Sequence, residues 1–153
     1  MIQYYWGFKM STDTKNYDSL KLKNQLCFPL YAASREILRK YTPILKNLNL
    51  TYTQYIVMMV MWEQKKLTVV DLGKQLYLDS GTLSPLLKSM EEKGLISRVR
   101  DKDDERVVRI AITDEGEALK ERAVEVPSQI GNCLNINSEE AQSLYTILYK
   151  IIG

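Results

Sequence analysis

The feature of this sequence that restricts its fold most is a pair of helical segments joined by a tight connection. Thr68 is placed to cap a helix that ends near Leu76, and a second helix runs from Ser80 to Lys93. Gly94 follows directly and favours a C-terminal stop. The second helix has one apolar stripe at helical spacing, made by Leu83, Leu86, Leu87 and Met90. Two helices joined by about four residues, the second beginning with small polar side chains, predict a helix-turn-helix.

A charged hairpin follows this pair of helices at once. The segments 95–100 and 107–112 alternate as strands, and Val108, Ile110 and Ile112 share one face. The segment 101–106 between them is charged throughout. A helix-turn-helix followed by a β-hairpin predicts a winged helix. The expected fold class is therefore mainly α with a small β-hairpin wing (α+β).

Helices are also expected in front of this unit. The segment 20–41 repeats apolar residues at steps of three and four, namely Leu26, Leu30, Ala33, Ile37 and Tyr41. Pro29 is difficult inside that helix, because proline removes a backbone donor and clashes with the preceding turn. Either the helix begins near Phe28 or it kinks at this point, and we expect the kink. Thr42 and Pro43 then open a short helix that ends near Asn49, and 51–63 forms a buried helix.

Behind the hairpin, Thr113 is expected to cap a helix that reaches about Ile130 and kinks at Pro127. Asn137 opens the last helix through a capping box with Glu140. That helix has an apolar stripe made by Ala141, Leu144, Ile147, Leu148 and Ile151. Such a stripe packs either against the core or against a second copy of the chain.

Composition disfavours several classes of function. The 153 residues suit one domain, and a net charge of +2 is too small to indicate nucleic acid by itself. The chain has no histidine, which weakens zinc sites, His-based triads and His general bases together. We therefore expect no enzyme, no metal site and no cofactor. No apolar run is long enough to span a bilayer and no signal peptide is present, so we expect a cytoplasmic protein with reduced thiols.

Three short blocks carry a resemblance to a known family. The segments 78–88 (LDSGTLSPLLK), 103–106 (DDER) and 113–116 (TDEG) resemble the MarR family of dimeric winged-helix regulators. Within it, Leu26-Cys27-Phe28 and 50–55 (LTYTQY) resemble the organic hydroperoxide-sensing OhrR-type branch, whose features the MgrA/SarZ regulators share. The resemblance extends from Leu20 to the C-terminus.

The resemblance implies a domain organisation and a partner. Residues 1–19 are expected to be a mobile N-terminal arm, and 20–153 a single MarR-type domain. Within it, 20–50 and 113–153 would form the dimerisation helices, and 51–112 the winged helix-turn-helix that binds DNA. The implied function is a homodimeric repressor on a pseudo-palindromic double-stranded operator.

Cys27 has two interpretations. Composition alone favours a buried structural cysteine, because free cysteine behaves as a small hydrophobe. The resemblance implies instead a peroxide-sensing thiolate, stabilised by the hydroxyls of Tyr31, Tyr41 and Tyr52, the last reaching across the dimer. Tyr31 lies one helical turn from Cys27 on the same face. The expected product is a sulfenic acid that condenses with a low-molecular-weight thiol or with Cys133. Cys133 is otherwise an incidental cysteine in a loop.

The polar face of the second helix is the expected DNA contact. Ser80, Thr82 and Ser84 would face base edges and Lys88 a phosphate. At the hairpin tip, Asp104 would hold Arg106 as it enters the minor groove. The alternatives are a solvated helix face and an exposed charge cluster. Arg98, Arg100 and Arg109 are expected to be backbone contacts or strand-surface charges.

Two other functions remain open. One is a MarR-type repressor controlled by a small aromatic ligand, with an inert Cys27. The other is a winged-helix protein-interaction module that does not bind DNA. The sensor interpretation predicts that an organic hydroperoxide releases the dimer from its operator.

Overall fold

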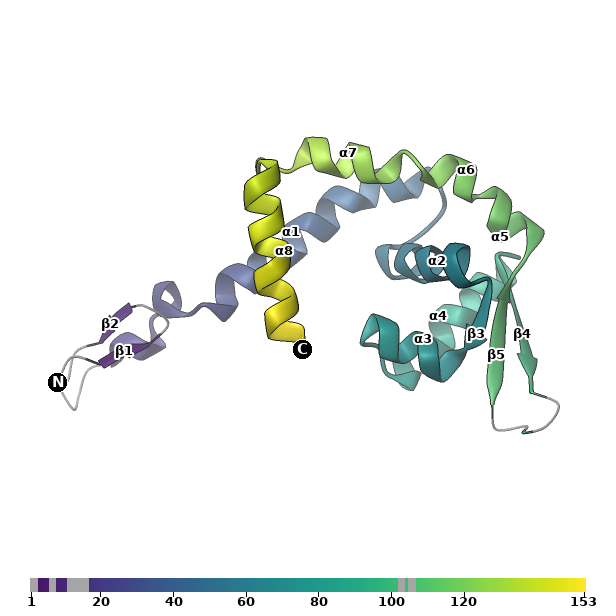
Figure 1. Ribbon diagram of the computed structural model, residues 1–153, viewed down its shortest axis with the longest axis horizontal. Helices are drawn as coiled ribbons and strands as arrows, with labels where there is room; N and C mark the ends of the chain where they lie inside the picture. Colours follow the sequence, from purple (N-terminus) through teal and green to yellow (C-terminus); the bar gives the residue numbers. More distant parts are fainter. Residues whose placement is uncertain (1–2, 6–7, 11–16, 102–103, 105–106) are drawn as a thin grey trace. The chain divides into compact units, whose positions relative to one another are not determined.

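The computed structural model describes residues 3–5, 8–10, 17–101, 104 and 107–153, which form two compact units, Met1–Tyr41 and Thr42–Gly153 (Figure 1). In the first unit, β1 (Gln3–Tyr5) pairs with β2 (Phe8–Met10) as an antiparallel hairpin. The sequence predicted no strand in this segment. Two 3-10 turns follow, η1 (Tyr17–Leu20) and η2 (Leu22–Asn24).

Helix α1 (Cys27–Lys46) differs from the prediction at both of its prolines. The helix begins at Cys27 rather than at Leu20, so Pro29 lies in the first turn. There the backbone N–H groups have no intrahelical acceptor, and proline costs little. The expected kink at Pro29 is therefore wrong, and the alternative, a helix that begins near Phe28, is confirmed. The separate helix expected from Thr42 is also wrong, because α1 continues through Pro43 to the buried Leu45.

The second unit contains the winged helix. Its elements are α2 (Tyr52–Gln64), β3 (Lys66–Thr68), α3 (Val69–Leu76), α4 (Ser80–Glu92), β4 (Ile96–Arg100) and β5 (Val108–Ile112). The strands form one antiparallel sheet in the order β3-β5-β4. The sequence predicted the hairpin β4-β5 but missed β3, which is only three residues long. The mainly helical winged fold is confirmed.

The core of this unit lies between α2, α3, α4 and the sheet. Apolar side chains from all of them are almost fully buried, among them Val57, Met58, Met61, Leu72, Leu83, Leu87, Met90 and Ile110. Side-chain caps define where each helix begins: Thr51 for α2, Thr68 for α3 and Asp79 for α4. The caps predicted at Thr68 and, beyond the sheet, at Thr113 are confirmed.

The chain after the sheet is more broken than predicted. Three short helices, α5 (Asp114–Ala118), α6 (Lys120–Ala123) and α7 (Val126–Cys133), replace the single helix expected to reach Ile130. Pro127 lies in the first turn of α7 instead of kinking a longer helix. The last helix, α8 (Ser138–Ile152), has the predicted capping box at Asn137.

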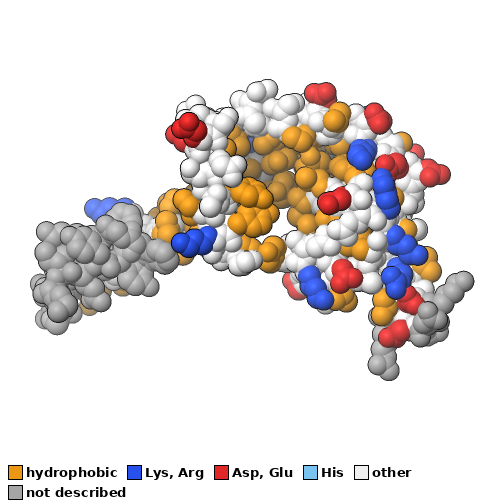
Figure 2. All heavy atoms as spheres, viewed as in Figure 1, with side chains coloured by type: hydrophobic (Ala, Val, Ile, Leu, Met, Phe, Trp, Pro, Cys, Tyr) orange, Lys and Arg blue, Asp and Glu red, His pale blue; other side chains and the backbone are white. Residues whose placement is uncertain are grey.

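Helix α8 buries none of its side chains in this single chain. Its exposed apolar residues are Leu144, Tyr145, Ile147, Tyr149, Ile151 and Ile152, and hydrophobic side chains are visible on it in Figure 2. An apolar face of this extent on one helix is typical of a surface that another chain covers.

Candidate nucleic-acid interface and thiol site

Helices α3 and α4 are joined by a turn that packs directly on α3. Tyr77 ends α3 in the left-handed conformation, with a φ of 54°. A Cβ on Gly73 would lie 2.7 Å from the carbonyl oxygen of Leu78, so only glycine lets the turn approach so closely. This close approach sets the angle between the two helices of the helix-turn-helix.

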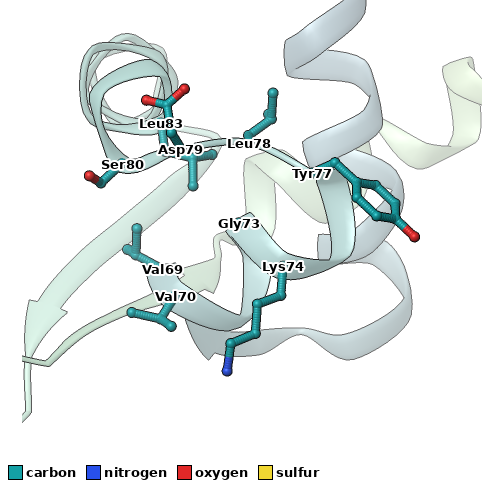
Figure 3. Close-up of a pocket in the computed structure, with 9 residues that line it drawn as sticks. All are labelled: Val69, Val70, Gly73, Lys74, Tyr77, Leu78, Asp79, Ser80 and Leu83. Carbon is teal, nitrogen blue, oxygen red and sulfur yellow. The ribbon is translucent and has the colours of Figure 1, made fainter. Parts of the chain in front are cut away.

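A groove of about 560 Å³ opens between these helices, and Figure 3 shows the residues that line it. Val69, Val70 and Lys74 come from α3, and Ser80 and Leu83 come from α4. The groove therefore reaches the end of α4 at which small polar side chains were predicted to meet base edges.

The first turn of α4 is held by the carboxylate of Asp79. One oxygen accepts from the backbone N–H of Thr82 at 2.9 Å, and the other accepts from its hydroxyl at 3.0 Å. These two hydrogen bonds, the backbone one first, lower the pKa of Asp79. Ser84 donates its hydroxyl to the carbonyl oxygen of Ser80 at 2.7 Å. The hydroxyl protons of Thr82 and Ser84 are thus used inside the protein, and their outward lone pairs remain acceptors.

All four predicted residues of α4 are exposed: Ser80, Thr82, Ser84 and Lys88. The ammonium of Lys88 lies 4.0 Å from Glu92, and such an exposed pair contributes little. Lys88 is therefore able to exchange this partner for a phosphate. The structure places the four side chains on the exposed side of α4, as the sequence predicted.

The hairpin tip is closed by the backbone. Asp101 donates its N–H to the carbonyl of Val107 at 2.8 Å, and Val107 donates to the carbonyl of Asp104 at 2.9 Å. Asp104 is exposed, whereas Arg106 lies outside the described residues. The predicted contact between these two side chains therefore lies outside the described residues.

Two arginines of the wing are held by internal ion pairs. Arg98 donates from Nε and Nη2 to Glu91 of α4, at 2.8 and 2.6 Å, and lowers the pKa of that carboxylate. Arg109 of β5 pairs with Asp101. Arg98 thus ties the wing to α4, which favours the interpretation as strand-surface charges over DNA-backbone contacts.

Cys27 is the first residue of α1 and is exposed, so the buried structural cysteine that composition favoured is not what the structure shows. Tyr31, four residues later, is also exposed, and its hydroxyl accepts from Arg35 at 3.0 Å. The Arg35 guanidinium carbon lies 5.7 Å from the Tyr31 ring centroid. Sequence reasoning missed Arg35, although its i+4 spacing from Tyr31 was visible. Tyr41 lies further along the same helix and is half-buried.

Tyr52 belongs to the second compact unit and is the first residue of α2. A tyrosine keeps its proton at neutral pH, and burial raises the pKa of Tyr52 further, so its hydroxyl remains a hydrogen-bond donor. Cys133 is exposed and ends α7, so its prediction as a loop residue is wrong. Cys27 and Cys133 are both free thiols.

The part of the chain that the structure describes contains no cluster of three side chains able to hold a metal ion. None of its helices is both long and apolar enough to cross a membrane.

The amino-acid sequence is similar to those of known transcriptional regulators. Residues 39–123 match the family model of the transcriptional regulator SarA/Rot. The organic hydroperoxide resistance transcriptional regulator of Bacillus subtilis is 48% identical, over 89% of this chain and 92% of its own length. The regulator SarZ of Staphylococcus aureus is 42% identical, over 86% of this chain and 89% of its own.

Solved structures agree with these relatives. The DNA-bound structure of reduced AbfR, a Staphylococcus epidermidis protein, is 33% identical and superimposes with a TM-score of 0.76 over 88% of this chain and 92% of that one. A mutant MarR from E. coli in complex with operator DNA has a TM-score of 0.78, over 90% of this chain and 99% of that one. Its identity is 23%, so this second likeness supports the fold alone.

Proposed function

Because this chain belongs to the SarA/Rot and MarR group of winged-helix proteins and is a DNA-binding transcriptional regulator of the OhrR, SarZ and AbfR type, we propose that it is a cytoplasmic homodimeric repressor released from its operator by oxidation of Cys27. The observation that carries the proposal is the exposed thiol at the start of α1, in a chain whose α4 presents an exposed polar face.

The DNA contact would be made by two copies of α4. Each helix would enter one major groove of a pseudo-palindromic operator, with the two half-sites about one helical turn apart. Ser80, Thr82 and Ser84 would meet base edges and Lys88 a phosphate. Arg106 would enter the minor groove, with Asp104 orienting it. The exposed apolar stripe of α8 supports a homodimer, because a second copy is the partner that would cover it.

The sensing step would be nucleophilic. The Cys27 thiolate attacks a peroxide oxygen of ROOH, an S–O bond forms, the O–O bond breaks, and the alkoxide takes a proton to leave as an alcohol. Phenolic hydroxyls of Tyr31 and Tyr41, and that of Tyr52 reaching across the dimer, would donate hydrogen bonds to the thiolate. The sulfenic acid then condenses with a thiol, either Cys133 or a small molecule, to give a disulfide and water.

Operator binding with and without an organic hydroperoxide tests this function. The DNA upstream of the protein's own gene is titrated by fluorescence anisotropy, before and after treatment with cumene hydroperoxide, with mass spectrometry on both cysteines. We expect tight, salt-dependent binding of the reduced protein, and loss of affinity together with a modified Cys27. Binding that weakens only with a small aromatic acid, while Cys27 stays reduced, would support ligand control instead. No binding to DNA would point to a protein-interaction module.

A further inference from the structure

Among the described residues of the second unit, one polar side chain is buried. Gln54, in the first turn of α2, is only 4% exposed. Burying an amide without partners is costly, so each of its polar atoms needs a hydrogen bond. The partners of Gln54 show which parts of the protein this residue connects.

Gln54 binds within its own helix and across to α4. Its Oε1 accepts from the backbone N–H of Thr51 at 3.1 Å, which completes a capping box. The same oxygen accepts from Nζ of Lys93 at 2.9 Å, and Nε2 donates to the hydroxyl of Ser89 at 3.3 Å. Ser89 lies in the last turns of α4 and Lys93 is its C-cap. A capping box needs only the first of these bonds, so the other two require a separate explanation.

Lys93 extends the connection to the turn after α1. Its ammonium also donates to the carbonyl oxygen of Asn49 at 2.5 Å. Asn49 has a φ of 55°, in the turn between α1 and α2. No carboxylate in the described part of the chain forms an ion pair with Lys93. The charged end of Lys93 is therefore used to hold the end of α4 against the beginning of α2.

We propose that Gln54, Lys93 and Ser89 form the coupling element that transmits a change at the first turn of α2 to the DNA-reading helix α4. This inference rests on the proposed function, in which the Tyr52 hydroxyl donates a hydrogen bond to the Cys27 thiolate, so that oxidation of the thiol would displace the tyrosine. Tyr52 and Gln54 lie in the same turn of α2, so a displacement of the tyrosine moves the buried amide. Because the amide is bonded to both Ser89 and Lys93, the C-terminal end of α4 moves with it.

Several features make this network suited to such a role. The hydrogen bonds of the Gln54 side chain to Thr51, Ser89 and Lys93 are partly buried. A hydrogen bond is stronger where the surroundings are less polar than water, and bonds in one network strengthen one another. Packed helices joined by a buried network switch between discrete arrangements instead of bending gradually. Gln54 is a positioning residue in this scheme, since it contacts neither the thiol nor the DNA in the roles proposed above.

The test compares two substitutions at one position. Gln54→Leu keeps the volume and removes all three side-chain hydrogen bonds. Gln54→Glu keeps an acceptor for Thr51 and Lys93, and the hydroxyl of Ser89 can rotate to donate to it. Gln64→Leu is the matched control, because Gln64 is on the same helix and its amide bonds Gln75 of α3 at 2.9 Å. Lys93→Met and Ser89→Ala each remove one hydrogen-bond partner of Gln54. These two variants test the coupling role if Gln54→Leu does not fold.

For each protein, operator affinity is measured in the reduced and the peroxide-treated state, together with the rate of Cys27 oxidation. In the wild type we expect oxidation to weaken binding by about 5- to 150-fold. Gln54→Leu and Lys93→Met should oxidise at the wild-type rate and bind operator when reduced, yet lose most of that ratio. Gln54→Glu and Gln64→Leu should keep it. A merely structural role would lower both affinities together and leave the ratio unchanged.

The outcomes separate this inference from the function on which it rests. A wild type that oxidises at Cys27 without losing affinity refutes the proposed function, and the coupling role with it. A wild type that responds, with Gln54→Leu and Lys93→Met responding equally, overturns the coupling role alone. A ratio lost because Cys27 no longer oxidises in the variants also overturns it, since the defect then lies in sensing.

Discussion

The indole Nε1 of Trp62 donates a 2.8 Å hydrogen bond to the backbone carbonyl oxygen of Gly116. This bond joins the C-terminal half of α2 to the first turns of α5, and Trp62 also packs edge-on against Tyr55. Gly116 itself lies so close to Leu95 that a Cβ would overlap the carbonyl oxygen of that residue. Helix α2 is therefore anchored at both ends, to α5 through Trp62 and to α4 through Gln54.

Gly116→Ala should destabilise the protein by about 1–3 kcal/mol or more, because the new methyl group overlaps backbone that cannot move away. Trp62→Phe should cost about 1–3 kcal/mol, since it leaves the carbonyl of Gly116 buried without a donor. Urea unfolding followed by circular dichroism measures both. Gly131→Ala is the control: a Cβ there meets nothing within 4 Å, and alanine is the better residue inside a helix. Equal stability of Gly116→Ala and wild type would contradict the close approach.

The cap of α4 should make stability depend on pH in the acid range. The pKa of Asp79 is lowered from 3.8, mainly by hydrogen bonds from Thr82, so the folded protein favours the carboxylate. That contribution is present above the unfolded pKa and is lost as the pH falls through the folded one. Asp79→Asn keeps a cap acceptor without a titrating group. The difference in unfolding midpoint between the wild type and Asp79→Asn should therefore shrink from pH 7 towards pH 3. If the difference in unfolding midpoint stays constant with pH, the charge of the Asp79 carboxylate does not contribute to stability.

Cys27→Ser should bind operator like the reduced wild type and ignore cumene hydroperoxide, because serine forms no sulfenic acid. Anisotropy titrations before and after the oxidant measure this. Cys133→Ser separates the two possible thiol partners. If Cys133 is the partner, its loss should leave a sulfenic acid or a small-molecule disulfide on Cys27, visible by mass. Release of Cys27→Ser by peroxide would show that the sensor lies elsewhere.

Arg106→Ala should weaken operator binding and reduce the slope of log K against log salt by about 1, because one phosphate or groove contact fewer releases fewer counterions. Titrations at several salt concentrations measure the slope. Arg39→Ala is the matched control, since Arg39 is exposed on α1 and pairs with Glu36. An unchanged slope and affinity in Arg106→Ala would remove the wing tip from the DNA contact.

Local signals predicted much of this fold correctly. The caps at Thr68, Thr113 and Asn137, the stop at Gly94 and the hairpin after it depend on residues only a few positions apart. Such short-range preferences are legible in a sequence, and they placed the exposed polar face of α4 as well. The exposure of Cys27 could not be predicted in this way, because the burial of a side chain depends on which parts of the folded protein pack against it.

The prolines show why other predictions failed. Proline disfavours a helix interior, yet Pro43 lies within α1, where the packing of Leu45 and its neighbours offsets one lost backbone hydrogen bond. Pro29 and Pro127 both lie in first turns, where the missing donor has no acceptor to satisfy. Tertiary packing decides where each helix starts, and therefore where each proline lies within it. The helix propensity of a single residue carries no information about that packing.

The sequence by itself determined the winged helix-turn-helix, since helix caps, apolar stripes and strand alternation all act over short distances along the chain. It also supplied the residues whose pattern resembles the peroxide-sensing regulators. Only the tertiary structure decided that β3 completes the sheet and that Trp62 reaches Gly116. It likewise decided that Gln54 is buried against Lys93 and Ser89, because hydrogen bonds between residues 35 or more positions apart form only once the helices have packed.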